Sequence, residues 1–277
     1  MTADLHCHSR VSDGSMGIDD IVFYAKRAGL SFLALTDHDT MAGVTRAGVI
    51  GKRYGVQVIP GVEISCKDPA TGKKVHLLCY LPDKPDRLEG FLKSLLDKRA
   101  AAGMQMIKNV MQYYPLTVEH VAKYYSSSQS IYRAHIMHAL IDLGYDNQIY
   151  GEVYRALFGK GGSCFMPVDY PDIEQGLQIV HEAQGVAVIA HPGETGNLEL
   201  CERLAAEGKI QGLEVYHPLN DEETRERLLT LCQRFSLIPT GGTDFHGFYR
   251  PHPYPLGSFL APPDAVSRLY QLKAKNA

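Results

Sequence analysis

The chain has 277 residues, of which 45% are hydrophobic and 21% are charged, and its formal net charge is −3. This composition is typical of one large α/β domain, or of such a domain with an insertion, and it suffices for a hydrophobic core. The slightly acidic balance argues against a surface that coats nucleic acid, so duplex nucleic acid is not an expected partner.

Features of secreted and membrane proteins are missing from the sequence. The six cysteines show no CxxC pairing, which is typical of reduced thiols in a cytoplasmic protein. The N-terminus lacks a basic region followed by an apolar run, so we expect no signal peptide. Apolar segments stay well below the ~20 residues that a membrane span requires, so we expect no membrane partner.

Short apolar runs alternate with amphipathic stretches along most of the chain. After a first strand around residues 4–8, the runs predict strands at 32–35, 56–59 continuing into 62–65, 75–80, 186–190, 212–216 and 237–240. The amphipathic stretches predict helices at 18–30, 41–54, 173–184, 198–207, 222–235 and 264–275. Continuous apolar strands between helices indicate a parallel sheet covered on both faces. We therefore expect a barrel related to the (β/α)8 type, with an open doubly wound sheet as the alternative.

Residues 87–159 interrupt this alternation, because their patterns are helical only. They predict one or two helices at 88–114 and further helices at 118–125, 131–143 and 148–158, with a glycine-rich return at 159–162. The stretch is too long for one strand-to-helix connection and too apolar for a disordered loop. We predict a small all-helical insertion at 87–159 that covers the active site of a barrel made of residues 1–86 and 160–277.

A His-x-His pair opens the chain. In an extended segment His6 and His8 point to the same side, about 7 Å apart along the backbone, while Cys7 points to the other side. Two imidazoles placed in this way can close on one divalent metal ion. We assign Cys7 to packing.

Further imidazoles and carboxylates stand on or near the ends of the other predicted strands. In chain order the candidates are His6, His8, Asp13, His38, Glu63, His76, His191, His217, Asp244 and His246. The strand ends of a parallel barrel form one face, so these side chains should converge there. Such a ring is electrostatically unfavourable without metal, and mixed nitrogen and oxygen ligands favour Mn, Fe or Zn.

Five motifs resemble, in order, those of the PHP (polymerase and histidinol phosphatase) family. They are His6-x-His8, Thr36-Asp37-His38-Asp39, Gly61-Val62-Glu63, Ala190-His191-Pro192 and Thr243-Asp244-x-His246. The resemblance covers the whole chain and implies a distorted seven-stranded (β/α)7 TIM-like barrel that holds two or three divalent metal ions. The helical insertion resembles that of the stand-alone members that act on nucleotides and related phosphates.

The resemblance also implies three sets of metal ligands. The first set is His6, His8, Glu63 and Asp244. Glu63 would bridge to a second ion, held with His76 and His191, and a third ion would be held by Asp13, His38 and His246. Some family members have histidine where Asp13 stands, but a carboxylate there still suits a hard metal ion.

These ligands predict a phosphoesterase. Three carboxylates facing three dications leave about three positive charges, which suits a phosphate dianion. We expect hydrolysis of phosphate monoesters or cyclic phosphodiesters of small nucleotide or sugar phosphates by attack of a metal-activated hydroxide. Glu63 and Asp244 would act with the metals, and His217 would serve as general acid or as a donor to phosphate, unless it is only a hydrogen-bonded strand-end histidine.

Positive groups outside the metal site should bind the substrate. Arg133 is the best candidate, because it lies in the insertion and its guanidinium fork matches phosphate oxygens, unless it is only a surface charge of a helix. His135 in the same segment is predicted to assist, as similar Arg-x-His segments do in related phosphoesterases. Lys160 in the glycine-rich return is a weaker candidate.

Other functions fit less well. Alternatives within phosphate chemistry are a phosphatase of the histidinol-phosphate type and a 5'-3' exonuclease on short oligonucleotides. Amide and amine hydrolases also use His-x-His barrels, but they often need a bridging lysine, and no lysine stands at a predicted strand end. A metal-binding regulatory module would be favoured by missing ligands, and the sequence retains all of them.

Overall fold

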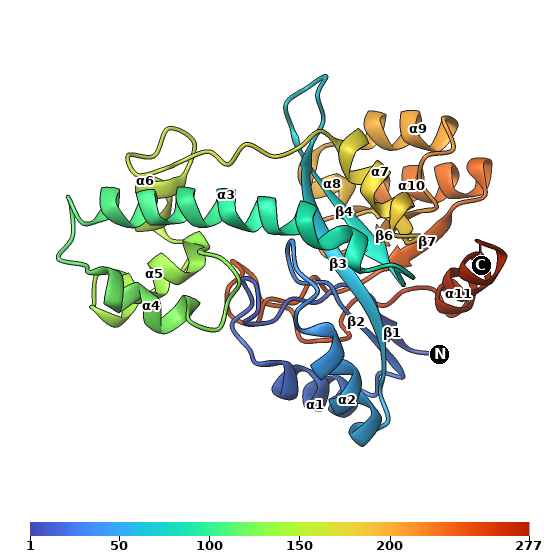
Figure 1. Ribbon diagram of the computed structural model, residues 1–277, viewed down its shortest axis with the longest axis horizontal. Coiled ribbons are helices and arrows are strands. Elements are labelled where there is room, and N and C mark those ends of the chain that lie inside the picture. The colour runs from blue at the N-terminus through green and yellow to red at the C-terminus, as the bar shows by residue number, and fades with distance from the viewer. Residues whose placement is uncertain (277) are drawn as a thin grey trace.

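The computed structural model describes residues 1–276, within which seven strands form one sheet in the order β1 to β7 (Figure 1). The strands are β1 Ala3–Asp4, β2 Phe32–Leu35, β3 Gln57–Lys67, β4 Lys74–Tyr80, β5 Val186–Ile189, β6 Gly212–Tyr216 and β7 Ile238–Gly241. Every strand predicted from the sequence is present. The arrangement is the predicted barrel and not the open doubly wound alternative.

Backbone hydrogen bonds beyond the ends of β7 and β1 bring the sheet close to closure. Leu5 N donates to Gly241 O at 3.1 Å, and His8 N donates to Phe245 O at 2.8 Å. A side chain at Gly242 would place its Cβ atom 2.4 Å from His6 N, so this approach needs glycine. The closure holds the His6–His8 segment against the segment that follows β7.

The prediction of a parallel sheet is wrong for β4. This strand runs antiparallel to both β3 and β5, whereas the other pairs are parallel. Only six residues separate β3 from β4, and a parallel crossover needs a dozen or more. The antiparallel course brings the N-terminal end of β4, which carries His76, to the edge where the parallel strands have their C-terminal ends.

Amphipathic helices cover the outside of the barrel. Figure 1 shows α1 and α2 on one side, α7, α9 and α10 on the opposite side, and α11 near the N-terminus. Their bounds, with the short α8, are α1 Ile18–Arg27, α2 Val44–Tyr54, α7 Ile173–Glu182, α8 Pro192–Thr195, α9 Leu198–Ala206, α10 Glu222–Phe235 and α11 Ala265–Asn276. Leu5, Ile59, Leu78 and Val188 belong to a buried cluster that joins β1, β3, β4 and β5. This packed interior supports the rim where the polar candidates lie.

Residues 86–158, between β4 and β5, form a helical lobe beside the barrel (Figure 1). Its helices are α3 Asp86–Val110, α4 Val118–Tyr125, α5 Arg133–Asp142 and α6 Glu152–Phe158. They share a hydrophobic cluster that includes Ile107, Val121 and Met137. This cluster supports the predicted helical insertion, and its boundaries at residues 87 and 159 remain a prediction. Within the part of the chain that the structure describes, no helix has the length and apolar character to cross a membrane.

Candidate metal centre

The His-x-His segment lies just beyond β1 and not on it, as the sequence had suggested. Cys7 forms an isolated bridge with Phe245, and its side chain packs in a buried cluster with Ile21 and Leu33. His6 and His8 are fully buried on the other side of the segment. The predicted alternation therefore holds although the regular strand ends at Asp4.

A first group of ligand atoms consists of His6 Nε2, His8 Nε2, Glu63 Oε2 and Asp244 Oδ1. The two imidazole nitrogens lie 3.1 Å apart. Glu63 Oε2 lies 3.3 Å from His6 Nε2 and 3.1 Å from His8 Nε2, and Asp244 Oδ1 lies 3.4 Å and 3.2 Å from the same atoms. These side chains come from residues up to 238 positions apart in the chain and surround one point.

These separations are those of ligands around one metal ion. For metal–ligand bonds of about 2.1 Å, neighbouring ligand atoms lie ~3.4 Å apart in a tetrahedron and ~3.0 Å apart at right angles. The five measured separations, 3.1 to 3.4 Å, fall in this interval. The first group can therefore hold a divalent ion without moving its side chains far.

A second group forms around the other oxygen of Glu63. His76 Nδ1 and His191 Nε2 lie 3.0 Å and 2.9 Å from Glu63 Oε1, and 3.3 Å from each other. The Glu194 carboxylate lies 3.5 Å from His191 Nδ1, the ring nitrogen that faces away from Glu63. Glu63 thus faces both groups, as the resemblance implied.

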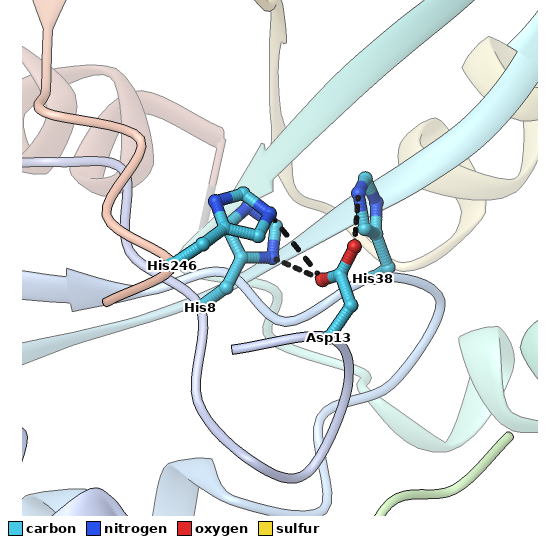
Figure 2. A group of neighbouring side chains, drawn as sticks. All are labelled: His8, Asp13, His38 and His246. Atoms are coloured by element: carbon cyan, nitrogen blue, oxygen red, sulfur yellow. Dashed lines mark ion pairs between the residues drawn. The ribbon is translucent and has the colours of Figure 1, made fainter. Parts of the chain in front are cut away.

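A third group surrounds Asp13 and is more open (Figure 2). The Asp13 carboxylate lies 3.4 Å from His246 Nε2, 3.6 Å from His8 Nδ1 and 3.8 Å from His38 Nε2. A neutral imidazole has one lone pair on nitrogen, so His8 cannot use both nitrogens as ligands. If Nε2 serves the first group, Nδ1–H faces Asp13.

Unpaired buried atoms provide a test of whether metal ions fit. Seven buried side-chain nitrogen or oxygen atoms lack a hydrogen-bond partner among the described residues, and five of them belong to these groups: His8 Nδ1, His38 Nδ1, Glu63 Oε2, His191 Nδ1 and Asp244 Oδ1. An unpaired buried polar atom costs about 1–3 kcal/mol. Divalent ions would satisfy the two carboxylate oxygens among them, Glu63 Oε2 and Asp244 Oδ1, so the donor set fits the implied metals.

The electrostatics of the centre also favour cations. Burial would raise the pKa of Glu63, but His38, His6 and His76 outweigh it and hold that pKa well below its usual range. Burial likewise opposes ionisation of Asp13, and His246 and His38 keep its pKa well below normal. Both carboxylates are therefore anionic at neutral pH, as metal ligands must be.

Glu214 is a site residue that our sequence reasoning missed. Its Oε1 lies 3.0 Å from His6 Nδ1, and its Oε2 accepts a hydrogen bond from His191 N at 2.8 Å. A carboxylate on the distal nitrogen fixes the tautomer and the ring orientation of a metal-binding histidine. The only signal in the sequence was a glutamate in the middle of the apolar strand Gly212–Tyr216.

Three residues near the centre adopt a backbone conformation that is rare outside glycine. The φ angles are 28° for His191, 50° for Asp244 and 56° for Asp39. Each such residue costs about 1–3 kcal/mol and persists only where its surroundings fix it. Their position at the rim indicates that the fold maintains the ligand directions against local preference.

His217 lies beside the first group and is buried. Its Nδ1 accepts a hydrogen bond from Leu219 N at 3.1 Å, so Nε2 carries the proton and points to Asp244 Oδ2 at 3.3 Å. Burial lowers the pKa of His217 to about 3. The neutral imidazole is therefore a hydrogen-bond donor at the edge of the metal centre.

A cavity of about 690 Å³ opens from the metal centre towards the helical insertion. Arg133 lines it, with its guanidinium over the rings of Tyr154 and Phe165. Lys74 lines it too, and partial burial together with repulsion from Arg133 and Arg99 lowers the pKa of Lys74 to about 8. Among the described residues, neither Lys74 nor Arg133 has a carboxylate within salt-bridge distance.

Arg250 is a third cation of the cavity wall, and the sequence patterns did not indicate it. Its guanidinium contacts the carboxylates of Asp244 and Glu194 and so lies at the border between the metal centre and the cavity. Sequence offers little signal for it, because it follows the last motif in an irregular segment.

Two predicted substrate-binding residues lie elsewhere. His135 is buried, and its Nδ1 accepts a hydrogen bond from Tyr132 N at 3.3 Å at the start of α5. Lys160 is exposed in the return after α6. Neither is among the described residues that line the cavity. Their predicted roles therefore find no support in this geometry.

Comparisons with known proteins agree with this geometry. The sequence pattern of the PHP domain matches residues 4–187. The chain is 36% identical over 249 residues to the phosphoribosyl 1,2-cyclic phosphate 1,2-diphosphodiesterase of Eggerthella lenta, covering 89% of this chain and 95% of that protein. It is 30% identical over 253 residues to a 5'-3' exoribonuclease of Haemophilus influenzae, covering 88% of this chain and 89% of the relative.

A solved structure shares the whole fold. A Bifidobacterium adolescentis protein, described as a metal-dependent phosphoesterase, superposes with a TM-score of 0.89 at 29% sequence identity. The match covers 98% of this chain and 96% of that protein. The arrangement of barrel and helical lobe is therefore common to both.

Proposed function

Because the chain belongs to the PHP domain family, we propose that it is a metal-dependent phosphoesterase that hydrolyses phosphate monoesters or cyclic phosphodiesters of small nucleotide or sugar phosphates. The observation that carries the proposal is the first ligand group, whose atoms stand 3.1 to 3.4 Å apart around one point. The relative in Eggerthella lenta makes a cyclic phosphate of a sugar the first substrate to test.

The metal ligands we propose are those the resemblance implied. His6, His8, Glu63 and Asp244 would hold one ion, Glu63 with His76 and His191 a second, and Asp13, His38 and His246 a third. Mn, Fe or Zn suits this mixture of imidazole and carboxylate. Bound ions would neutralise phosphoryl oxygens and lower the pKa of a water molecule near them.

The residues of the chain then orient the reaction. In hydrolysis the water oxygen bonds to phosphorus, the bond from phosphorus to the sugar oxygen breaks, and a proton reaches that leaving oxygen. His217 is neutral, with Nε2–H directed at Asp244 Oδ2 beside the first group, and would transfer this hydrogen bond to a phosphoryl or leaving oxygen when substrate binds. Glu214 keeps His6 in the tautomer whose Nε2 is free for the metal.

The cavity supports a phosphorylated substrate with an extended body. Lys74 and Arg133 present positive charge that no described carboxylate neutralises, and Arg250 adds charge next to the metals. Tyr154 and Phe165 offer ring faces in the same wall. Cations and aromatic faces together suit a nucleotide or a sugar phosphate better than a neutral ester.

A 5'-3' exonuclease acting on short oligonucleotides is the second candidate. The relative in Haemophilus influenzae and the cations that line the cavity of about 690 Å³ favour it. A phosphatase of the histidinol-phosphate type has no specific support in the cavity. A non-enzymatic metal-binding module is disfavoured because all the proposed ligands converge. The free and mostly buried cysteines support a reducing compartment such as the cytoplasm.

A substrate screen with metal-loaded protein tests the proposal. Nucleotides, nucleoside bisphosphates, ribose cyclic phosphates, sugar phosphates and short oligonucleotides are incubated with protein supplied with Mn²⁺, and released phosphate or opened diester is measured. We expect turnover that a chelator abolishes and Mn²⁺ restores. If no member of the panel is hydrolysed by protein shown to contain metal, the proposed function is wrong.

A further inference from the structure

The third ligand group differs from the other two in what supports it. Asp13, His38 and His246 lie on the irregular segments that follow β1, β2 and β7. Each of these segments also contacts the helical insertion, residues 87–159. The three attachments come from different parts of the insertion, so together they fix the group from one side.

The segment that carries Asp13 is attached by the connection between α4 and α5. Ser128 Oγ donates to Ser12 O at 2.7 Å, and Gln129 N donates to Val11 O at 2.8 Å. Both acceptors are within two residues of Asp13. The insertion therefore supplies two hydrogen bonds to the backbone that sets the direction of this carboxylate.

The segment that carries His38 is attached by α3 and by the start of α5. Tyr132 OH donates to His38 O at 3.3 Å, and the rings of the two residues stack with centroids 6.2 Å apart. Arg99 Nη2 on α3 donates to Asp39 Oδ2 at 2.7 Å. The Arg99 guanidinium lies 4.8 Å from the centre of the Tyr132 ring, which joins the two contacts into one unit.

The segment that carries His246 is attached through Tyr249. This tyrosine is only 4% exposed and belongs to the hydrophobic cluster of the insertion. Its hydroxyl lies 2.6 Å from His138 Nδ1 on α5, and the neighbouring Phe248 ring packs edge-on against His138. The anchor of His246 thus lies inside the core of the insertion.

The first two groups have fewer such attachments: Arg99 Nη2 also donates to Ser65 Oγ at 2.8 Å, two residues from Glu63, and Asp244 shares the segment of His246. Glu63 and His76 lie on β3 and β4, and the backbone of His191 is held by Glu214. The His6–His8 segment bonds to Phe245. His6, His8, Glu63, His76 and His191 are thus held mainly by contacts within the barrel.

We propose that the helical insertion organises the third metal site, so that this ion binds with full affinity only when the insertion is docked. The inference rests on the metal ligands of the proposed function. Tyr132 and the adjacent Arg133 also line the substrate cavity. One support therefore positions the third ion and the substrate contacts, and the first two ions depend on it less.

A metal titration tests the proposal without requiring turnover. The variant Ser128→Ala/Tyr132→Phe/Tyr249→Phe removes one polar contact from each of the three segments. Metal-stripped protein is titrated with Mn²⁺ against a chromogenic chelator, and the number and affinity of bound ions are compared with the wild type. Asp13→Asn identifies which bound ion belongs to the third group.

A matched control makes the same chemical changes in the insertion at side chains that have no described hydrogen bond to the barrel. Ser127→Ala/Tyr113→Phe/Tyr145→Phe alters one serine and two tyrosines on exposed positions. Thermal unfolding of all proteins in the metal-free state shows whether folding is intact.

We expect the triple variant to weaken the ion that Asp13→Asn removes by about 10- to 100-fold, with the other ions weakened less and the control unchanged. Wild-type binding in the triple variant, equal weakening of every ion, or full occupancy in Asp13→Asn would overturn the proposal. Wild-type protein that binds these ions but hydrolyses no phosphate ester would contradict the proposed function. The metal titrations of the variants would still test whether the insertion supports the third site.

Discussion

Replacement of Glu214 by glutamine changes one atom of a buried side chain and isolates its role. In the wild type both carboxylate oxygens accept hydrogen bonds, from His6 Nδ1 at 3.0 Å and from His191 N at 2.8 Å. Glutamine has one oxygen and one NH₂ group, so either His6 or His191 must face a donor. The volume of the side chain is retained, so packing is not altered.

The magnitude follows from these two contacts. A buried donor left without an acceptor costs about 1–3 kcal/mol, and loss of the partner of a metal-binding histidine typically weakens metal affinity 10- to 100-fold. In the metal-free protein burial lowers the pKa of His6, but Glu214 and Glu63 outweigh it and raise that pKa to about 10. Without the Glu214 charge the pKa of His6 should fall.

Two measurements check this prediction. Competition titration should show the weaker metal affinity, and denaturant unfolding of the metal-free protein should show the lost stability. Glu199→Gln is the matched control, because the Glu199 side chain is 81% exposed and its ion pair with Arg227 is 3.9 Å long. Equal metal affinity and equal unfolding free energy in Glu214→Gln and wild type would refute the role assigned to Glu214.

Three further predictions concern the cavity, the metal and pH. Lys74→Met and Arg133→Ala should each raise KM for a phosphorylated substrate about 10-fold or more with little change in kcat, measured by steady-state kinetics; unchanged KM rejects the cavity as substrate site. Saturating Mn²⁺ at 100 times Kd should raise the free energy of unfolding by about 2.7 kcal/mol per site, and calorimetry without any shift argues against specific ions. In metal-free protein, burial lowers the pKa of His8 to about 4 and of His217 to about 3, below the unfolded value of 6.5. The unfolded chain then binds more protons at these two histidines below pH 6.5, so their contribution to stability is full above that pH and falls as pH drops towards 4, by ~1.4 kcal/mol per unit and histidine. A flat acid profile in denaturant titrations contradicts this.

Much of the centre was predictable because the ligands sit in short motifs at strand ends. His-x-His needs only the alternation of an extended chain, and Ala190-His191-Pro192 follows an apolar run that could only be a buried strand. The same local rules indicated the helical insertion, since an unbroken helical pattern cannot serve as a single crossover. These features are local, and local patterns are what a sequence displays directly.

The direction of β4, the support of His6 by Glu214 and the attachments of the third group were decided by tertiary structure. Glu214 is 208 residues from His6, and Tyr249 reaches the insertion core from beyond β7. Arg250 and Lys74 likewise face the cavity from segments without a motif. Such contacts depend on which distant segments the closed barrel brings together, and no spacing along the chain encodes that. The sequence alone therefore determined which residues can bind metal, and the closure of the barrel against the insertion determined what holds each of them in place.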